Sequence, residues 1–347
     1  MNLKNTELLM KAMEQNKDFD SYGVLVSING NKKFIHSDNV NYETYFDIAS
    51  IGKALVTAQL ILKSLSEKKL SLENTLNDFF KNVPDDKKNI TITQLLTHTS
   101  GIIRVPIPEE IADKGNDAIA EYIINAPLAY KPDCGQIYSC NAYILLGFIA
   151  EKIYKLPLDK AFYTYVKEPL HLTHCRFNIA VDEDNAAVCY KREKAGKYRA
   201  DDENVYVMKG IAGNGASFWT MSDLDKFADA IMTRSEAIYS ERIYDLAERD
   251  YVGQAGNAWG LGYLIVDENY PQTGKLFPAN SFGHCGHTGA SFFISRKKNM
   301  YVIILTNATR FLNMRSGFKG YDYSVIEKMR EKIHNEIYKD LIEENLI

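Results

Sequence analysis

Apolar and polar residues alternate in patterns that predict strands near both ends of the chain. Residues 22–30, YGVLVSING, followed by NKKFIHS, predict a β-hairpin that turns at its Asn-Gly-Asn sequence. In the last third, residues 259–267, 291–296 and 300–307 are rich in β-branched and aromatic side chains. The polar sequence RKKN between the last two segments predicts a hairpin loop.

Helical periodicity dominates the rest of the chain. Residues 3–13 predict a short amphipathic helix, and residues 50–65 predict an apolar one. The stretch from about 71 to about 201 has mostly helical patterns joined by loops. A further helix is expected from Ser222, whose hydroxyl is suited to an N-cap. A charged helix from 323 to about 343 closes the chain.

This distribution predicts an α/β (α+β) fold. Strands at both chain ends indicate one antiparallel sheet built from both termini and flanked by helices, with an inserted, mainly helical region. The expected division is a sheet region of residues 1–65 plus 222–347 and a helical region of residues 66–221. The chain length of 347 residues fits one such unit.

Composition excludes some partners and predicts a compartment. Apolar residues make up 46% and charged residues 25%, which is ordinary for a globular protein. The net charge of −4 gives no reason to expect nucleic acid or an anionic membrane as a partner. We expect no membrane span, since no apolar run is long enough, and no signal peptide, since the N-terminus lacks an apolar core. Five cysteines without an export signal favour reduced thiols in the cytoplasm. The oligomeric state stays open.

Metal binding is not expected. The sequence HLTHC at 171–175 has possible ligands, but no matching second half follows, so we interpret it as a loop.

Lys53, which follows Ser50 by three residues in the first turn of the helix predicted at 50–65, is unusual for that position in a helix. A lysine in the first turn opposes the helix dipole, and the neighbouring Ile51 and Leu55 indicate no solvated face. Residues three apart share a helix face, so an amine lies beside a hydroxyl. Burial and the helix start both disfavour the protonated amine. A neutral lysine beside a serine is a nucleophile with its base.

The pair alone is a weak signal. The Ser-x-x-Lys pattern begins at four serines, Ser50, Ser66, Ser295 and Ser316, and only Ser50 opens an apolar helix. On this pair alone, a serine N-cap followed by a surface lysine is the favoured interpretation.

Two further stretches change this balance. Residues 132–153, PDCGQIYSCNAYILLGFIAEKI, and 282–307, FGHCGHTGASFFISRKKNMYVIILTN, join Ser50-Ile51-Gly52-Lys53 in a specific pattern. Together they resemble the serine β-lactamase and penicillin-binding-protein superfamily, and its class C β-lactamase, D-alanyl-D-alanine carboxypeptidase and esterase branch in particular. The resemblance runs from about residue 22 to about 330, with the motifs in the family's order.

The resemblance implies residue roles. Ser50 matches the acylated nucleophile and Lys53 its lysine partner, and Tyr138 matches the tyrosine that acts with the lysine as general base and later as acid. His284-Cys285-Gly286 matches the Lys/His-Thr/Ser-Gly strand motif. The oxyanion hole would use the backbone N–H groups of Ser50 and His287.

Two departures bear on the substrate. Cys140 occupies the position of the family's asparagine, and Asn141 lies one place later, where a loop shift would let it serve. A thiol is a poor substitute for an amide, which offers both a donor and an acceptor. Cys285 replaces a hydroxyl residue, and His284 replaces the commoner lysine, so a substrate carboxylate meets less positive charge. These changes favour an esterase or a small-peptide hydrolase over a strong β-lactamase.

The resulting hypothesis is a serine hydrolase that forms an acyl-enzyme on an ester, amide or β-lactam carbonyl, with no metal or organic cofactor. The main alternative is a non-hydrolytic sensor that binds penicillin-like ligands, and a third is a structural or partner-binding protein. His98 is interpreted as structural. Phe218, Trp219 and Tyr143 either wall the pocket or fill the core.

Overall fold

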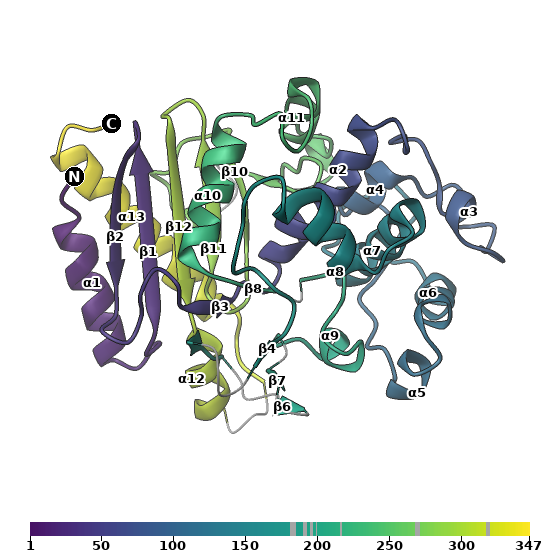
Figure 1. The fold of residues 1–347 in the computed structure, drawn as a ribbon, viewed down its shortest axis with the longest axis horizontal. Helices are drawn as coiled ribbons and strands as arrows, with labels where there is room; N and C mark the ends of the chain where they lie inside the picture. Colours follow the sequence, from purple (N-terminus) through teal and green to yellow (C-terminus); the bar gives the residue numbers. More distant parts are fainter. Residues whose placement is uncertain are drawn as a thin grey trace.

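A six-stranded antiparallel sheet forms one half of the molecule (Figure 1). The computed structural model describes residues 1–180, 185–189, 193–194, 197–198, 200–215, 217–267, 271–316 and 320–347. The strand order is β2-β1-β12-β11-β10-β9. The strands are β1 (Tyr22–Ile28), β2 (Asn31–His36), β9 (Leu264–Ile265), β10 (Phe282–Cys285), β11 (Ser291–Ser295) and β12 (Met300–Thr306). The N-terminal hairpin pairs with the C-terminal strand β12, so the expected sheet from both chain ends is confirmed.

Helices cover both faces of this sheet. On one side lie α1 (Lys4–Gln15) and α13 (Ser324–Glu343), and on the other α10 (Met221–Met232) (Figure 1). Because successive strand residues face opposite sides, Val24 of β1 packs in the cluster formed with α1 and α13, whereas Leu25 packs in the main core.

The helical side is centred on α7 (Cys140–Tyr154), which is buried almost all round. Around it pack the π-helical turn η1 (Lys53–Thr57) and helices α2 (Ala58–Ser66), α4 (Ile92–Leu96), α6 (Asn116–Asn125) and α8 (Leu158–Phe162). The remaining helical elements are α3 (Leu76–Phe79), α5 (Glu109–Ala112), η2 (Tyr163–Lys167), α9 (Glu203–Val207), α11 (Glu241–Ala247), η3 (Gly253–Ala255), η4 (Pro271–Thr273) and α12 (Ala308–Arg315). Since η1 and α2 contact α7, the proposed boundary at residue 65 falls within this helical packing.

Two small sheets complete the fold. One has the order β5-β3-β8, with β3 (Tyr45–Asp47) between β5 (Ala186–Ala187) and β8 (Phe218–Trp219). The other joins β4 (Ile179–Ala180), β7 (Lys197–Tyr198) and β6 (Glu193–Lys194). Strand β3 leads directly to Ser50 and so connects the sheet side to the helical side.

Two local predictions need correction. The strand expected at 259–267 is only β9, because the chain turns at Gly262, which has a positive φ of 95°, and Trp259 forms a bridge to Leu264. The N-cap of α10 is Thr220 and not Ser222, which lies inside the helix. The Thr220 hydroxyl accepts the N–H of Asp223 at 3.4 Å.

The carboxylate of Asp223 holds the segment HLTHC, residues 171–175, in place. This buried carboxylate accepts the backbone N–H groups of Thr173, His174 and Cys175 at 3.0, 2.7 and 2.7 Å. This segment therefore serves as an anchor between α10 and the loop that leads away from η2.

Replacing Asp223 by alanine is expected to lower the free energy of unfolding by about 3 kcal/mol, because three backbone N–H groups, one of them fully buried, lose their carboxylate acceptor. Asp223→Asn keeps one carbonyl acceptor and should lose less. Urea denaturation measures both variants. Equal losses in the two would show that packing, not hydrogen bonding, holds this segment.

Two further observations concern the described residues. None of their helices is long and apolar enough to cross a bilayer. They include all five cysteines, and no disulfide joins any two of them.

Candidate active site

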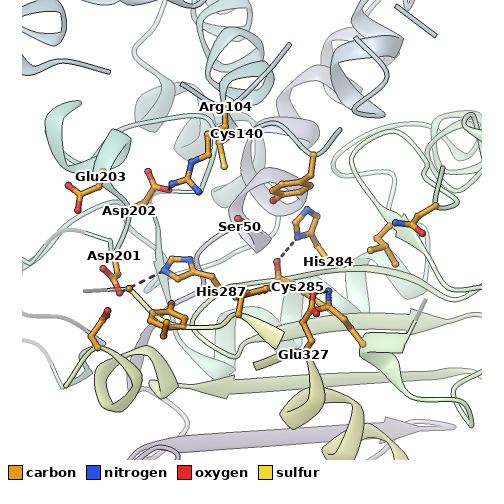
Figure 2. Close-up of a pocket in the computed structure, with 18 of the residues that line it drawn as sticks. Ser50, Arg104, Cys140, Asp201, Asp202, Glu203, His284, Cys285, His287 and Glu327 are labelled. Atoms are coloured by element: carbon orange, nitrogen blue, oxygen red, sulfur yellow. Dashed lines mark hydrogen bonds and ion pairs between the residues drawn. The ribbon is translucent and has the colours of Figure 1, made fainter. Parts of the chain in front are cut away.

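A cavity of about 920 Å³ lies where the two halves of the molecule meet. Six of the residues singled out in the sequence line it: Ser50, Tyr138, Cys140, His284, Cys285 and His287. Figure 2 shows Ser50 between Cys140 and the strand that carries His284 and Cys285. Residues more than 230 positions apart in the chain thus share one cavity, because Gly286, just after β10, lies against Ile48 and Ala49, just before Ser50.

Ser50 and Lys53 form a hydrogen-bonded pair. Ser50 Oγ lies 2.9 Å from Lys53 Nζ, which also donates to the backbone carbonyl of Asn214 at 2.5 Å. The Lys53 side chain is fully buried. Burial lowers the pKa of Lys53 from its ordinary value of 10.5, while the Cys140 thiol and the Asp202 carboxylate act in the opposite direction. The amine is therefore biased towards its neutral, proton-accepting form.

The backbone before Ser50 is strained and held from two sides. Ala49 has a positive φ of 49°, unusual for a residue with a side chain. The Asp47 carboxylate accepts the Ala49 N–H at 2.8 Å and fixes this turn. Gly286 approaches so closely that an added Cβ would lie 2.6 Å from the Ile48 carbonyl oxygen. The strain and the close glycine together expose Ser50 at the head of its helix.

The backbone N–H groups of Ser50 and His287 bear on how the cavity can stabilise negative charge. Within the described residues, neither the N–H of Ser50 nor that of His287 donates a hydrogen bond. Both residues line the cavity. Such donors are available to an oxygen that gains negative charge.

Arg330 fixes the peptide group that carries the His287 N–H. Its fully buried guanidinium donates to the Gly286 carbonyl at 2.5 Å and to the Tyr323 hydroxyl at 2.7 Å. The carbonyl of Gly286 and the N–H of His287 belong to one planar peptide and point in opposite directions. Holding the carbonyl on the α13 side therefore holds the N–H on the other side.

Tyr138 is positioned through His98. The N–H of Ser139 donates to His98 Nδ1 at 3.1 Å, and the His98 and Tyr138 ring centroids are 4.5 Å apart. Lys53 Nζ lies 5.0 Å from the Tyr138 ring centroid. The Tyr138 side chain keeps 42% exposure along the cavity, yet desolvation of its phenol raises its pKa well above 10.0. The phenol at rest therefore carries its proton.

His284 is neutral and presents an acceptor. Its Nδ1 donates to the Cys285 carbonyl at 2.8 Å, which leaves Nε2 unprotonated. The residue is 3% exposed, and its Nε2 has no hydrogen-bond partner among the described residues. Burial and the nearby Lys53 lower its pKa from 6.5 to about 3. At neutral pH this position carries no positive charge.

His287 faces carboxylates. Its Nε2 lies 3.8 Å from Asp201 Oδ2. Burial alone would lower the pKa of His287, but Asp201, Asp47 and Asp202 outweigh it and the net shift is upward. Burial raises the pKa of Asp47 to about 6, against the effects of His287 and of two backbone N–H donors. This end of the cavity combines one imidazole with several acids.

Asn141 is not brought to the cavity. It is buried, its Nδ2 donates to the Val105 carbonyl at 3.1 Å, and its Oδ1 accepts from Asn204 at 3.4 Å. Consecutive helix residues point about 100° apart, so Cys140 faces the cavity and Asn141 cannot. No loop shift replaces the asparagine of the motif.

Other side chains were missed or left open by sequence reasoning. Phe218, Trp219 and Tyr143 are buried in the core and do not line the cavity. Trp259 does line it, and no periodic pattern marked it. Arg330 was also missed, although a signal for it exists: it interrupts the apolar face of α13 that Ile326 and Ile333 define, and a cation there indicates a buried partner.

A known protein is similar to this chain in sequence over most of its length. A protein named "Putative D-alanyl-D-alanine carboxypeptidase" from Salmonella heidelberg (strain SL476) is 24% identical over 323 residues, covering 83% of this chain and 74% of the relative.

Two solved structures share the fold. One is an octameric penicillin-binding protein homologue from Pyrococcus abyssi, with a TM-score of 0.73 and 22% identity over 99% of this chain and 77% of that one. Another is EstCE1, a hydrolase with promiscuous acyltransferase activity, with a TM-score of 0.71 and 19% identity over 91% of this chain and 98% of that one.

A family model places the chain more directly than these individual likenesses. The model described as Beta-lactamase matches residues 9–318, which is most of the chain and includes every motif quoted above. The chain belongs to the beta-lactamase family of hydrolases.

Proposed function

We propose that this hydrolase works through an acyl-enzyme on Ser50. The observation that carries the proposal is the 2.9 Å contact between Ser50 Oγ and the buried amine of Lys53. A serine hydroxyl is a weak nucleophile until a base accepts its proton, and a desolvated amine is such a base.

The proposed mechanism assigns a residue to each step. Lys53 takes the Ser50 proton as Oγ attacks the carbonyl carbon of the substrate. The N–H groups of Ser50 and His287 stabilise the oxyanion of the tetrahedral intermediate. The protonated phenol of Tyr138 donates to the leaving group and recovers a proton from Lys53. Water then releases the acyl group by the same steps in reverse.

The neighbouring residues favour an ester or small amide over a penicillin. Penicillins and D-alanyl-D-alanine peptides carry a carboxylate, and the neutral His284 offers no charge for it. Cys140 lacks the amide that would pair with a peptide-like side chain. We propose esterase or small-peptide hydrolase activity, with weak β-lactam turnover.

Intact-protein mass spectrometry tests the mechanism. The protein is mixed separately with a penicillin and with p-nitrophenyl acetate, and released product is followed in parallel. We expect acyl adducts or turnover that are absent in Ser50→Ala, with the ester preferred. A stable adduct without turnover would identify a sensor instead. The absence of both adduct and product with both reagents would overturn the proposed chemistry.

A further inference from the structure

We propose that a small cavity beside Ser50 holds the water molecule that hydrolyses the acyl-enzyme, and that the side chains of Asn214 and His287 position this water. The inference rests on the proposed function, since it concerns how the ester formed on Ser50 is released.

The small cavity adjoins the large cavity of about 920 Å³ without being part of it. Its volume is about 10 Å³, which is room for about one water molecule. Ser50 and His287 line both cavities, whereas Asn214 and Gly215 line only the small one. A molecule in the small cavity therefore lies beside the nucleophile without taking the space of the substrate.

The side-chain oxygen of Asn214 supplies an acceptor for this water. Asn214 is 2% exposed, and its Oδ1 has no hydrogen-bond partner among the described residues. The orientation of the amide is fixed, because Nδ2 donates to Asp202 Oδ1 at 3.3 Å and an ionised carboxylate can only accept. A buried acceptor without a partner is costly, and an O–H of a water in the cavity that Asn214 lines would remove that cost.

The imidazole of His287 supplies a second polar contact. Figure 2 shows its ring between Ser50 and Asp201, and all three residues line the small cavity. Its Nε2 lies 3.8 Å from Asp201 Oδ2, which is longer than a direct hydrogen bond and within the span of a bridging water. The backbone N–H of His287 is a proposed oxyanion donor, so a water held at this imidazole is near the acyl carbonyl that the N–H would bind.

The step balances with the groups already assigned. The water oxygen forms a bond to the acyl carbon as one of its O–H bonds breaks, and the proton passes to the pair of Lys53 and Tyr138. When the bond from this carbon to Ser50 Oγ breaks, Oγ takes that proton and the product leaves as a carboxylic acid. Asn214 connects the two parts of the step, because its side chain contacts the water and its backbone carbonyl accepts from Lys53 Nζ at 2.5 Å.

Deacylation should therefore depend on the small cavity more than acylation does. Asn214→Leu removes the acceptor, and Ala200→Val fills space at the buried wall of the small cavity without changing a polar group. Each should lower the rate constant for deacylation by about tenfold or more, and that for acylation by less than about threefold. Pre-steady-state kinetics with p-nitrophenyl acetate separate the two constants, and intact-protein mass spectrometry measures the acyl-enzyme that accumulates. Equal losses in the two constants would contradict the proposed role of the cavity.

Competition between water and methanol gives a readout that a loss of stability would not change. Methanol is too large for the small cavity and must reach the acyl group through the large one. The ratio of methyl acetate to acetate formed should rise by about tenfold in Asn214→Leu, in Ala200→Val and in His287→Phe, which keeps its backbone N–H.

Asn178→Leu is the matched control for this ratio. The Asn178 Oδ1 is also buried without a partner among the described residues, but Asn178 lines neither cavity. Its variant should leave the ratio unchanged. A ratio unchanged in Asn214→Leu and Ala200→Val, or raised equally in Asn178→Leu, would overturn the inference.

A crystal structure of the unmodified protein separates this inference from the proposed function. We expect an ordered water in the small cavity, within about 3.2 Å of Asn214 Oδ1. Such a water in a protein that forms no acyl-enzyme would refute the proposed catalysis and leave the water site standing. A small cavity without this water, in a protein that hydrolyses the ester through Ser50, would refute the inference alone.

Discussion

Lys53→Met is expected to lower the rate constant for acylation of Ser50 by about 10³-fold, since it removes the proposed general base. Methionine fills a similar apolar volume, and Lys53 is fully buried, so the variant should fold with its packing intact. Burst kinetics with p-nitrophenyl acetate measure the acylation step directly. Lys63→Met is the control. Lys63 lies in α2, which follows directly after η1, and its partly exposed amine is 3.5 Å from the Glu67 carboxylate.

The pH dependence of the same step gives a second readout. Lys53 must be neutral to accept the proton, so the rate should rise with pH through its folded pKa and then level off. Because burial lowers that pKa, the rise should have its midpoint below 10.5. In Lys53→Met the acylation rate should no longer rise with pH over this range. A rise that persists in the variant would contradict the assignment of the general base to Lys53.

Arg330→Met is expected to lower kcat by about 10²-fold with little change in KM, because misplacing one oxyanion donor affects the transition state more than the bound substrate. Arg330 is a positioning residue that acts through the peptide of Gly286 and His287. Arg330→Lys keeps a cation that can reach one carbonyl, so it should recover part of kcat. Steady-state kinetics on the ester measure the split between kcat and KM.

Loss of stability must be separated from this effect. Arg296→Met is the matched control, because Arg296 also bridges elements, donating to Glu248 Oε2 at 2.7 Å and to the Met232 carbonyl at 2.6 Å. It does not line the cavity. Both variants should unfold at lower denaturant concentration, but only Arg330→Met should lose kcat. Equal kinetic losses would reduce Arg330 to a structural role.

The fold was largely predictable because its signals are local. The N-terminal hairpin follows from strand alternation around an Asn-Gly-Asn turn, and the helix at 324–343 follows from helical spacing. The beta-lactamase family assignment followed from motifs in a fixed order, which the family model confirms over residues 9–318. The roles of Ser50, Lys53 and Tyr138 stay predictions, although the structure brings them to one place.

The boundaries of helices and strands, and hydrogen-bond partners distant in the sequence, were harder to predict. The N-cap of α10 is Thr220 because its hydroxyl reaches Asp223, whose carboxylate is also used by a loop about 50 residues away. The region that follows Trp259 looked like a strand, but the chain turns at Gly262. Local composition does not report such distant bonds and turns.

The sequence by itself determined which residues occupy the motif positions, including the substitutions at Cys140, His284 and Cys285. Only the tertiary structure decided their chemistry. Which of Cys140 and Asn141 faces the cavity depends on the rotation of α7. His284 is a neutral acceptor because its other nitrogen donates to a carbonyl and its ring is buried. Charge and hydrogen-bonding state depend on burial and on neighbours brought from elsewhere in the chain, and neither is written in the order of residues.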